Sequence, residues 1–333
     1  MRAAVFEGVR RPLVVKEVPD PSPGENEVLV ELKAAALNRR DLWILDGLYP
    51  GITTDVVLGS DGAGVVLEVG GGLSANLVGQ EVIINPGWHW GASDRAQSEE
   101  FRILGMPENG TFAERICVPV EYVYPKPKHL SWHEAAALPL AGLTAYRATF
   151  TQGELGPGEK LLVTGIGGGV ATFALLFGVA AGAVVAVTSS SEEKLSRARE
   201  HGARYGYDYT VPDWAKALLE ELGPVDVVVD GAGGTGFLHL IDVLAPGGRL
   251  VNYGVTAGVP PSCPLPRIFW RQLRIIGSTM GSPRDFERML DFLNRHELRP
   301  LVDRVFPLEG IGEALEYMRK SFQFGKIVIE IPG

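Results

Sequence analysis

A glycine-rich turn is the feature of this sequence that points most clearly to chemistry. The apolar stretch 160–164 leads into the glycines of residues 165–169, and a helix without charged residues is expected over 170–181. Glycines let the backbone approach a pyrophosphate, whose charge is then stabilised by the N–H groups at the helix N-terminus. Val170 stands where a GxGxxG pattern would have its last glycine. The turn predicts a dinucleotide site, with a glycine turn without a ligand as the alternative.

Hydroxyl side chains follow the next expected strand, residues 184–188. The residue that binds a ribose 2′-hydroxyl is normally an acid about 20 residues beyond the glycines. Here Ser189 to Ser191 stand at that place, and Lys194 lies one turn into the following helix. Hydroxyls can donate to a 2′-phosphate, and a lysine adds positive charge. We therefore expect NADP(H), with NAD(H) as the alternative if Glu192 or Glu193 reaches a ribose.

The serines also have a purely structural interpretation. Ser190 can cap the helix expected over 192–201, and Glu193 can complete its capping box. Capping and phosphate binding are compatible with each other, so a cap alone does not decide the cofactor.

Strand and helix signals alternate between residues 123 and 278. The capping-box sequence Ser131-Trp132-His133-Glu134 predicts a helix after residue 131. Apolar runs such as 184–187 and 225–229 are what a parallel strand covered on both faces requires. We expect an α/β fold with a doubly wound parallel sheet, with strands at 160–164, 184–188, 225–230, 249–253 and 274–277 and helices at 170–181, 192–201, 213–222 and 236–244.

Residues 1–122 show short strands separated by turns rich in glycine and proline. Strand character is clear at 13–18, 27–32 and 81–84. This part is expected to be a mostly antiparallel β domain, with a surface excursion at 87–110.

The tail, residues 279–333, is too short for a third domain. Helices are expected at 283–295 and 311–320, followed by a strand at 326–331. We expect this tail to pack on residues 1–122.

Composition argues against several classes of protein. The chain has 333 residues with 31 basic and 40 acidic side chains, a formal net charge of −9 that does not suit binding to nucleic-acid phosphates. Cys117 and Cys263 are too few for a disulfide framework or a four-thiolate zinc lobe, and they fit a reducing cytoplasm.

The N-terminus does not read as an export signal. Because Gly178 and Gly182 interrupt it, the uncharged stretch 170–187 is expected to be a buried helix and strand rather than a membrane span.

Several short motifs are spread along nearly the whole chain. They are Leu37-Asn38-Arg39-Arg40-Asp41, 59–66 (GSDGAGVV), 110–114 (GTFAE), 142–145 (GLTA), the glycine turn, 247–256 (GGRLVNYGVT) and 325–328 (GKIV). No single motif is specific, but together they make the chain resemble the medium-chain dehydrogenase/reductase superfamily, in its zinc-independent quinone oxidoreductase branch. The resemblance implies a GroES-like domain, 1–122 with 279–333, a Rossmann domain, 123–278, and an active-site cleft between them.

The resemblance also identifies the positions at which zinc-dependent relatives hold their catalytic metal. Those relatives use cysteine, histidine, glutamate and cysteine, and the matching residues here are Asn38, Ser60, Asp61 and Leu140. Of these four, only Asp61 has a side chain that could bind a metal, and residues 87–110 lack the cysteine quartet of a structural zinc site. A site built from His89, Asp61 and Cys117 is an alternative with widely scattered ligands. We expect no metal.

Without zinc, the range of reactions is narrower. A metal assists alcohol oxidation by lowering the pKa of a bound oxygen, as it lowers that of water from about 15.7 to about 7. A quinone or an α,β-unsaturated carbonyl instead takes hydride to give a phenolate or enolate, for which a few neutral donors suffice. The resemblance places Asn38 beside the nicotinamide and the carbonyl, where its amide could donate to the developing oxyanion. Asp41 could orient that loop or be only structural, and Tyr49 could line the pocket, donate a proton or simply pack.

The resemblance assigns further residues to the cofactor. Thr144 matches a position near the nicotinamide, Lys194 and Tyr209 match residues that flank the adenosine phosphate, and Lys326 lies where the family closes over the dinucleotide. Residues 254–256 follow a Rossmann strand end, where ligands gather in open parallel sheets. The full expected set is Thr144, Gly168, Gly169, Val170, Ser189, Lys194, Tyr209, Gly231, Gly254, Val255, Thr256, Met280 and Lys326.

We therefore expect an NADPH-dependent oxidoreductase that delivers hydride to a quinone or an α,β-unsaturated carbonyl without zinc. Its partner is then a small-molecule substrate, and neither a nucleic acid nor a membrane. Two alternatives are a zinc-type alcohol dehydrogenase and a non-catalytic sensor or tethering protein that binds NADPH. By analogy with the family, a homodimer through the edge strand 274–278, or a homotetramer, is expected in the cytoplasm.

Overall fold

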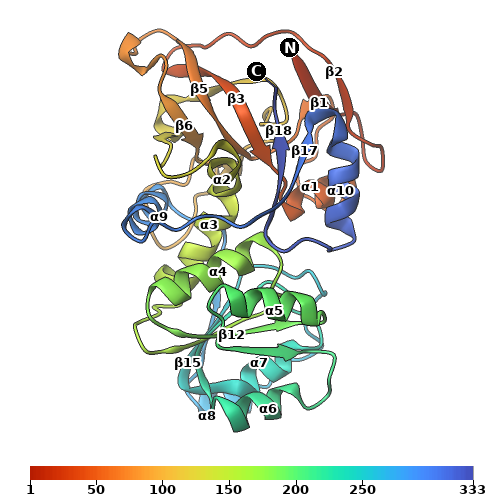
Figure 1. Cartoon of the computed structure of the whole chain (residues 1–333), viewed down its shortest axis with the longest axis vertical. Helices are drawn as coiled ribbons and strands as arrows, with labels where there is room; N and C mark the ends of the chain where they lie inside the picture. The colour runs from red at the N-terminus through yellow and green to blue at the C-terminus, as the bar shows by residue number, and fades with distance from the viewer. Residues whose placement is uncertain (333) are drawn as a thin grey trace. The chain divides into compact units, whose positions relative to one another are not determined.

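The computed structural model describes residues 1–332 and consists of two compact units (Figure 1). Unit 1 contains residues 1–141 and the chain from Ser282 onward, and unit 2 contains Gly142–Gly281. The expected fold class is confirmed, because unit 1 is rich in antiparallel β-structure and unit 2 has a six-stranded parallel sheet with helices.

The main sheet of unit 1 is built around β3 (Glu27–Ala36), which is buried along most of its length. The other strands of this sheet are β5 (Asp61–Val69), β6 (Glu81–Ile84), β9 (Arg115–Pro119), β10 (Val123–Pro125), β17 (Val302–Pro307) and β18 (Lys326–Glu330). Their order is β10-β6-β5-β3-β18-β17, and β9 also pairs with β3. Strand β18 pairs antiparallel with β3 and parallel with β17, so the tail joins the sheet of the N-terminal segment.

Smaller β-structures complete unit 1. They are the three-stranded sheet of β1 (Arg2–Phe6), β2 (Val14–Glu17) and β4 (Val56–Val57), and the two-stranded sheet of β7 (Gly87–Trp88) and β8 (Arg102–Ile103). In the segment expected to be a surface excursion, Trp88 and Trp90 are buried, whereas His89 between them is exposed. Part of that segment therefore anchors to the core.

Three of the four helices of unit 1, α2 (Trp132–Ala137), α9 (Pro283–Arg295) and α10 (Ile311–Arg319), begin at the residues that the sequence predicts. The fourth is α1 (Arg39–Leu45), and short turns lie at Ala75–Leu77, Val120–Tyr122 and Leu308–Gly310. Ser131 and Glu134 form the predicted capping box of α2, and Ser282 and Asp285 form one for α9. Helix α2 packs on β3 and β5. Residues 123–141 therefore group with unit 1, although the sequence placed them in the Rossmann domain.

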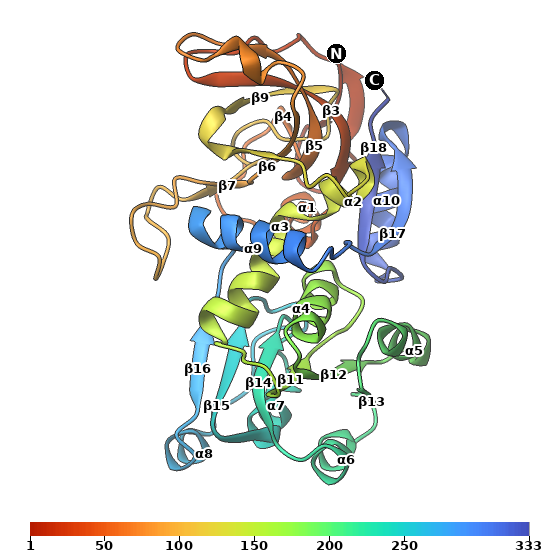
Figure 2. The ribbon, with the colours of Figure 1, turned by 60° about the vertical axis from the view of Figure 1, so that its left-hand side comes forward.

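Unit 2 contains the predicted doubly wound α/β structure. Its strands are β11 (Lys160–Val163), β12 (Val184–Ser189), β13 (Tyr205–Asp208), β14 (Val225–Asp230), β15 (Leu244–Asn252) and β16 (Arg274–Gly277). They lie parallel in the order β13-β12-β11-β14-β15-β16, as Figure 2 shows. The helices are α4 (Gly169–Ala180), α5 (Glu192–Glu200), α6 (Trp214–Glu221), α7 (Phe237–Val243) and α8 (Leu265–Trp270). Helix α3 (Pro139–Tyr146), whose first three residues belong to unit 1, continues into a π-helix at Arg147–Gln152.

Two details of unit 2 differ from the sequence predictions. The cap of α5 is Ser191, whose hydroxyl accepts the N–H of Lys194 at 3.4 Å, and not Ser190. The strand Tyr205–Asp208 was not predicted, because its tyrosines, glycine and aspartate do not form an apolar run. Helix α4 and strand β12 account for the uncharged stretch at 170–187, and no helix within residues 1–332 is long and apolar enough to span a bilayer.

Candidate functional site

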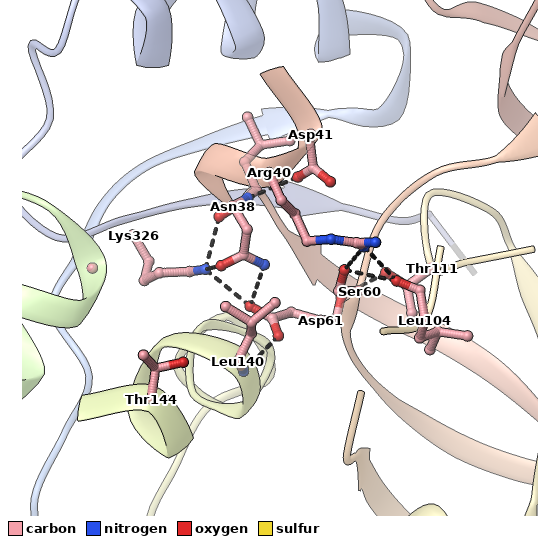
Figure 3. A network of polar contacts seen from close by, with 12 residues as sticks. Asn38, Arg40, Asp41, Ser60, Asp61, Leu104, Thr111, Leu140, Thr144 and Lys326 are labelled. Atoms are coloured by element: carbon pink, nitrogen blue, oxygen red, sulfur yellow. Dashed lines mark hydrogen bonds and ion pairs between the residues drawn. The ribbon is translucent and has the colours of Figure 1, made fainter. Parts of the chain in front are cut away.

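Three neighbouring strands bring the polar residues of unit 1 together. Strand β3 lies between β5 and β18, and Ala36 at its end pairs with Asp61 on one side and Val328 on the other. Asp61 is the first residue of β5, Lys326 is the first residue of β18, and Asn38 caps the helix that follows β3. The sheet thus collects side chains from three distant parts of the sequence at one end (Figure 3).

Lys326 supplies a buried cation to this cluster, with only 3% of its surface exposed. Its Nζ donates to Asn38 Oδ1 at 2.7 Å, to the carbonyl oxygen of Leu37 at 2.7 Å and to Asp61 Oδ2 at 2.9 Å. An ammonium has three N–H donors, so these three oxygens engage all of them. The ion pair also provides the partner that a buried charge requires.

Asp61 is fully buried and accepts hydrogen bonds on both carboxylate oxygens. Oδ1 accepts the backbone N–H of Leu140 at 2.8 Å, and Oδ2 accepts Asn38 Nδ2 at 2.9 Å in addition to Lys326. The Asn38 amide is therefore fixed from both sides, because the ammonium can only donate and the carboxylate can only accept. Its second N–H has no hydrogen-bond acceptor within the described chain.

Arg40 forms a second buried cationic contact, one residue before Asp41. Its Nη1 donates to Ser60 Oγ at 2.6 Å and to the carbonyl oxygen of Leu104 at 2.7 Å. The guanidinium lies over the ring of Tyr49, 4.7 Å from the ring centre. Tyr49 is partly buried against the core of unit 1. These contacts support the packing role of Tyr49, and no hydrogen bond within residues 1–332 joins it to Asn38 or Asp61.

Asp41 is fully buried and holds the backbone of Asn38. Its Oδ2 accepts the Asn38 N–H at 2.8 Å, at the first turn of α1. Burial raises the pKa of the Asp41 carboxyl to about 6, although Arg40 opposes that shift. This contact with the Asn38 backbone is compatible with both expected roles of Asp41, orienting the loop and a purely structural hydrogen bond.

The donor set of this cluster does not fit a zinc ion. Asp61 offers the one carboxylate among the four matching positions, and N–H donors engage both of its oxygens. An ammonium lies beside Oδ2, and the Ser60 hydroxyl is bound to a guanidinium. Among residues 1–332, no group of three or more His, Cys, Asp and Glu could hold a metal ion. That finding also covers the alternative set His89, Asp61 and Cys117.

The glycine turn of unit 2 fits the pyrophosphate of a dinucleotide. Gly165 and Gly167 have φ angles of 61° and 126°, which favour glycine. Helix α4 starts behind Gly168, and in the described structure neither a capping side chain nor an acid occupies its first turn. Its N–H groups and positive dipole end can therefore face an anion. A Cβ built on Gly165 or Gly168 would meet no atom within 4 Å, so the turn borders open space.

Asp230 organises the strand ends beside the glycine turn. This fully buried carboxylate accepts Thr164 Oγ1 at 2.6 Å, Asn252 Nδ2 at 2.9 Å and the N–H of Gly233 at 3.0 Å. It thereby links the ends of β11, β14 and β15. Sequence reasoning missed this residue, although a carboxylate at the end of the apolar run 225–229 was a usable signal.

The residues expected at the adenosine phosphate meet at the end of β12. Tyr209 donates from its hydroxyl to Ser190 Oγ at 3.2 Å, and its backbone N–H donates to the Ser189 carbonyl oxygen at 3.2 Å. Lys194 lies in the first turn of the adjacent helix. Glu192, a candidate for binding a ribose, forms an ion pair with Arg199 at 2.7 Å.

The other expected cofactor residues have partners of their own. The Gly231 carbonyl oxygen accepts the N–H of Thr256 at 3.2 Å, and a Cβ at Gly231 would lie 2.5 Å from the Tyr253 ring. Thr144 Oγ1 lies 3.8 Å from the sulfur of Met280. Gly254 and Val255 follow β15, as expected. Lys326, expected on the dinucleotide, instead directs all three ammonium donors to oxygens of unit 1.

Two protein-family models match this chain. Residues 24–128 match the alcohol dehydrogenase GroES-like domain, and residues 169–295 match the zinc-binding dehydrogenase model. The two matches fall largely in unit 1 and unit 2 respectively.

Curated relatives match over nearly the whole chain. The zinc-type alcohol dehydrogenase-like protein YogA of Leptosphaeria maculans is 40% identical over 340 residues, which cover 96% of this chain and 95% of the relative. The acryloyl-coenzyme A reductase of Metallosphaera sedula is 32% identical over 339 residues and 99% of both chains. Neither is named a quinone oxidoreductase, the branch expected from the sequence.

Solved structures show the same similarity. A crystal structure of an NAD-dependent alcohol dehydrogenase has a TM-score of 0.94 and 39% identity, with 100% of both chains covered. The crotonyl-CoA carboxylase/reductase AntE in complex with NADP has a TM-score of 0.90 and 25% identity, with 99% and 94% of the two chains covered. These similar structures thus include both an NAD-dependent protein and one bound to NADP.

Proposed function

Because the chain belongs to the medium-chain dehydrogenase/reductase superfamily and is an NAD(P)-dependent oxidoreductase, we propose a specific reaction for it. The protein reduces a quinone or an α,β-unsaturated carbonyl compound with NADPH and without zinc. The observation that carries this proposal is the buried Lys326–Asp61 ion pair, 2.9 Å long, in which an ammonium lies against the one carboxylate among the four positions that the family resemblance matches to metal ligands.

The chemistry of this cluster suits an acceptor whose oxygen gains charge. A dinucleotide whose pyrophosphate is held at the glycine turn would supply the hydride. The remaining N–H of Asn38 then donates to the oxygen of the phenolate or enolate. Asp41 holds the backbone of Asn38, and Lys326 and Asp61 hold its amide, so the donor does not have to reorganise during the reaction.

The conjugated acyl group is the acceptor class with the most support. Acryloyl and crotonyl groups, named in two of the similar proteins, are both α,β-unsaturated. Reduction of such a carbonyl produces an enolate, whose oxygen one neutral amide N–H held in a fixed position can stabilise. Quinones remain in the proposal because a phenolate oxygen requires the same hydrogen-bond donor from the site.

NADPH is proposed as the cofactor over NADH. The hydroxyls of Ser189, Ser190 and Tyr209 lie at the end of β12, and Lys194 follows them in α5. Glu192, one of the two carboxylates that could bind a ribose hydroxyl, is paired with Arg199 instead. These features favour a 2′-phosphate.

A zinc-type alcohol dehydrogenase is the second candidate. The names of the relatives favour it more than they favour a quinone reductase. The donor set around Asp61 opposes it. Metal content and alcohol oxidation therefore separate the two candidates directly.

The test uses the purified full chain with NADPH or NADH and a panel of quinones, enals, enones and conjugated acyl-CoA thioesters. We expect NADPH consumption with at least one acceptor, no loss after chelation and no stoichiometric zinc by mass spectrometry. Chelator-sensitive alcohol oxidation with tightly bound zinc would establish the second candidate. NADPH binding without any turnover would establish the sensor or tethering alternative.

Asn38→Ala supplies the matched test of the oxyanion donor. We expect kcat to fall by roughly 10²–10³-fold, the usual effect of removing one such donor. Asn294→Ala, at an exposed position of α9, is the control and should leave kcat unchanged.

Unit 2 also has a surface suited to a second copy of this chain. Strand β16 lies at the sheet edge, where Ile275 is 40% exposed, and Phe269 and Trp270 of the preceding helix are 69% and 82% exposed. An unpaired edge beside exposed apolar side chains favours pairing with another strand. We propose a homodimer through β16. Analytical sedimentation of the wild type should show a dimer, and Ile276→Pro should give monomers. A monomeric wild type would contradict the proposed dimer, and a tetramer would require a further interface.

A further inference from the structure

We propose that Lys326 is a positioning residue that acts as the fixed cation of the active site. Its ammonium locks the Asn38 amide in the orientation that presents an N–H to the acceptor oxygen, and it neutralises Asp61. This inference rests on the proposed function, because it identifies what holds the oxyanion donor in place. It also gives Lys326 a role other than the dinucleotide contact that the family resemblance implies.

Three oxygens form a complete cation site around Lys326 Nζ. They belong to the Leu37 backbone, the Asn38 side chain and the Asp61 carboxylate, at 2.7, 2.7 and 2.9 Å. Leu37 and Asn38 join β3 to α1, whereas Asp61 begins the neighbouring strand β5. The fold therefore places three acceptor oxygens around one point, and the Lys326 ammonium occupies that point.

The position of the ammonium decides which way the Asn38 amide faces. An amide has an acceptor at one end and two donors at the other. Lys326 requires the acceptor end, and Asp61 receives one donor at 2.9 Å. The other donor is left for a substrate. Because the amide oxygen bonds to a cation, the amide is also polarised and its N–H becomes a stronger donor.

The charge of Lys326 is as important as its geometry. Asp61 Oδ2 lies 2.9 Å from the nitrogen that is to stabilise a developing negative oxygen. An uncompensated carboxylate there would repel that oxygen in a region of low dielectric. Lys326, at 2.9 Å from the same carboxylate oxygen, cancels the repulsion. The pair thus lets a neutral amide act as the donor beside a buried acid.

The same contacts argue against Lys326 as the proton donor of the reaction. All three of its N–H groups are engaged, and only 3% of its surface is exposed. Loss of its proton would leave the fully buried Asp61 without a counter-charge. Its contribution is therefore positional and electrostatic.

Lys326→Ala with added methylammonium tests the proposal by chemical rescue. We expect kcat for the preferred acceptor to fall by roughly 100-fold, as for loss of one oxyanion donor, while NADPH affinity is retained. Methylammonium should restore kcat in a saturable manner, because it can donate to the same three oxygens. Tetramethylammonium has no N–H donor and should not. Wild-type kcat in the variant, a main loss of NADPH affinity, or no rescue by methylammonium would overturn the proposal.

Thermal unfolding provides a readout that does not depend on turnover. Methylammonium should raise the Tm of Lys326→Ala with concentration, because a ligand that binds the folded state stabilises it by mass action. Lys33→Ala is the matched control, since it removes a lysine paired with Glu31 in the same unit and should show no such response. If the wild type reduces no acceptor, the proposed function fails, whereas the Tm response still decides whether Lys326 fills a cation site.

Two further variants decide the matter if Lys326→Ala does not fold. Lys326→Arg keeps the charge, but a planar guanidinium cannot donate to three oxygens that converge on one point. The double variant Lys326→Met with Asp61→Asn removes both charges together, which avoids a lone buried ion. We expect both proteins to bind NADPH and to have a reduced kcat. Wild-type kcat in either would contradict the proposal.

Discussion

The polar cluster of unit 1 and the glycine turn of unit 2 differ in whether their hydrogen-bond donors are already engaged by the protein. In unit 1, buried side chains satisfy one another, and Asn38 retains a single N–H without a protein acceptor in the described structure. In unit 2, the backbone itself provides the binding groups, and the space beside Gly165 and Gly168 is open. Under the proposed function, the first arrangement fixes one donor for the reaction, whereas the second leaves several backbone donors for binding of a charged group.

This contrast predicts which kind of change each region tolerates. A substitution in the buried cluster leaves charges without partners, so it should alter stability as well as activity. A substitution at the open edge removes contacts to the ligand and little else, so it should alter cofactor affinity alone.

Among these predictions, Asp61→Leu in the polar cluster of unit 1 should have the largest effect on the free energy of unfolding. It leaves the Lys326 ammonium buried without a counter-charge, and we expect a loss of about 3–5 kcal/mol in the free energy of unfolding. Denaturant titration measures this loss. Asp94→Asn is the control, because Asp94 and Arg284 form an exposed pair that contributes at most about 1 kcal/mol. Equal losses in the two variants would contradict the closed arrangement.

The pH dependence of stability should show the cost of burying Asp41. Its folded pKa, about 6, lies above the usual 3.8, so the folded state binds this proton more tightly than the unfolded state. Its contribution therefore becomes unfavourable as pH rises from about 4 to about 6, by roughly 3 kcal/mol in total. Asp41→Asn should remove that contribution, so the difference from wild type should grow over this range. Parallel pH profiles would contradict the raised pKa.

Gly168→Ala should weaken cofactor binding at the glycine turn without unfolding the protein. The φ angle of Gly168 is −74°, and a Cβ there would enter the space assigned to the pyrophosphate. We expect NADPH affinity to fall by roughly tenfold or more, from lost charge-assisted hydrogen bonds, with little change in Tm. Gly236→Ala is the matched control, since Gly236 caps α7 at φ −65° and also borders open space. Similar affinities in both variants would rule out this pyrophosphate site.

Lys194→Ala should have the most selective effect. We expect NADPH affinity to fall by roughly tenfold, while NADH affinity stays nearly unchanged, because NADPH alone carries the 2′-phosphate that the ammonium would contact. Lys216→Ala, an exposed lysine of α6, is the control. Equal losses for both cofactors would remove the phosphate role from Lys194, and titration of cofactor fluorescence measures both.

Local sequence patterns predicted much of the fold. The capping box at Ser131 and Glu134 marked the start of α2, and the apolar runs marked the buried strands of unit 2. Both signals depend on residues close together in the chain. The strand Tyr205–Asp208 was missed because it lies at the edge of its sheet, where mixed polar and aromatic residues are tolerated.

The site was harder to predict, because its contacts join distant segments. The family resemblance correctly brought Asn38, Asp61 and Leu140 together, as their hydrogen bonds show. It gave no indication that Lys326, 265 residues beyond Asp61, would bond to the same carboxylate. Such a contact depends on the pairing of β18 with β3. No local pattern in the sequence encodes that pairing.

The insertion of β18 between β3 and β17 has a consequence for biosynthesis. Unit 1 receives its first 141 residues early, but unit 2 is translated before Ser282 and β18 follow. One partner strand of β3 and the counter-ion of Asp61 are thus translated only after the whole of unit 2. Nascent chains must hold an incomplete sheet with an unpaired edge, a state in which chaperones protect against aggregation.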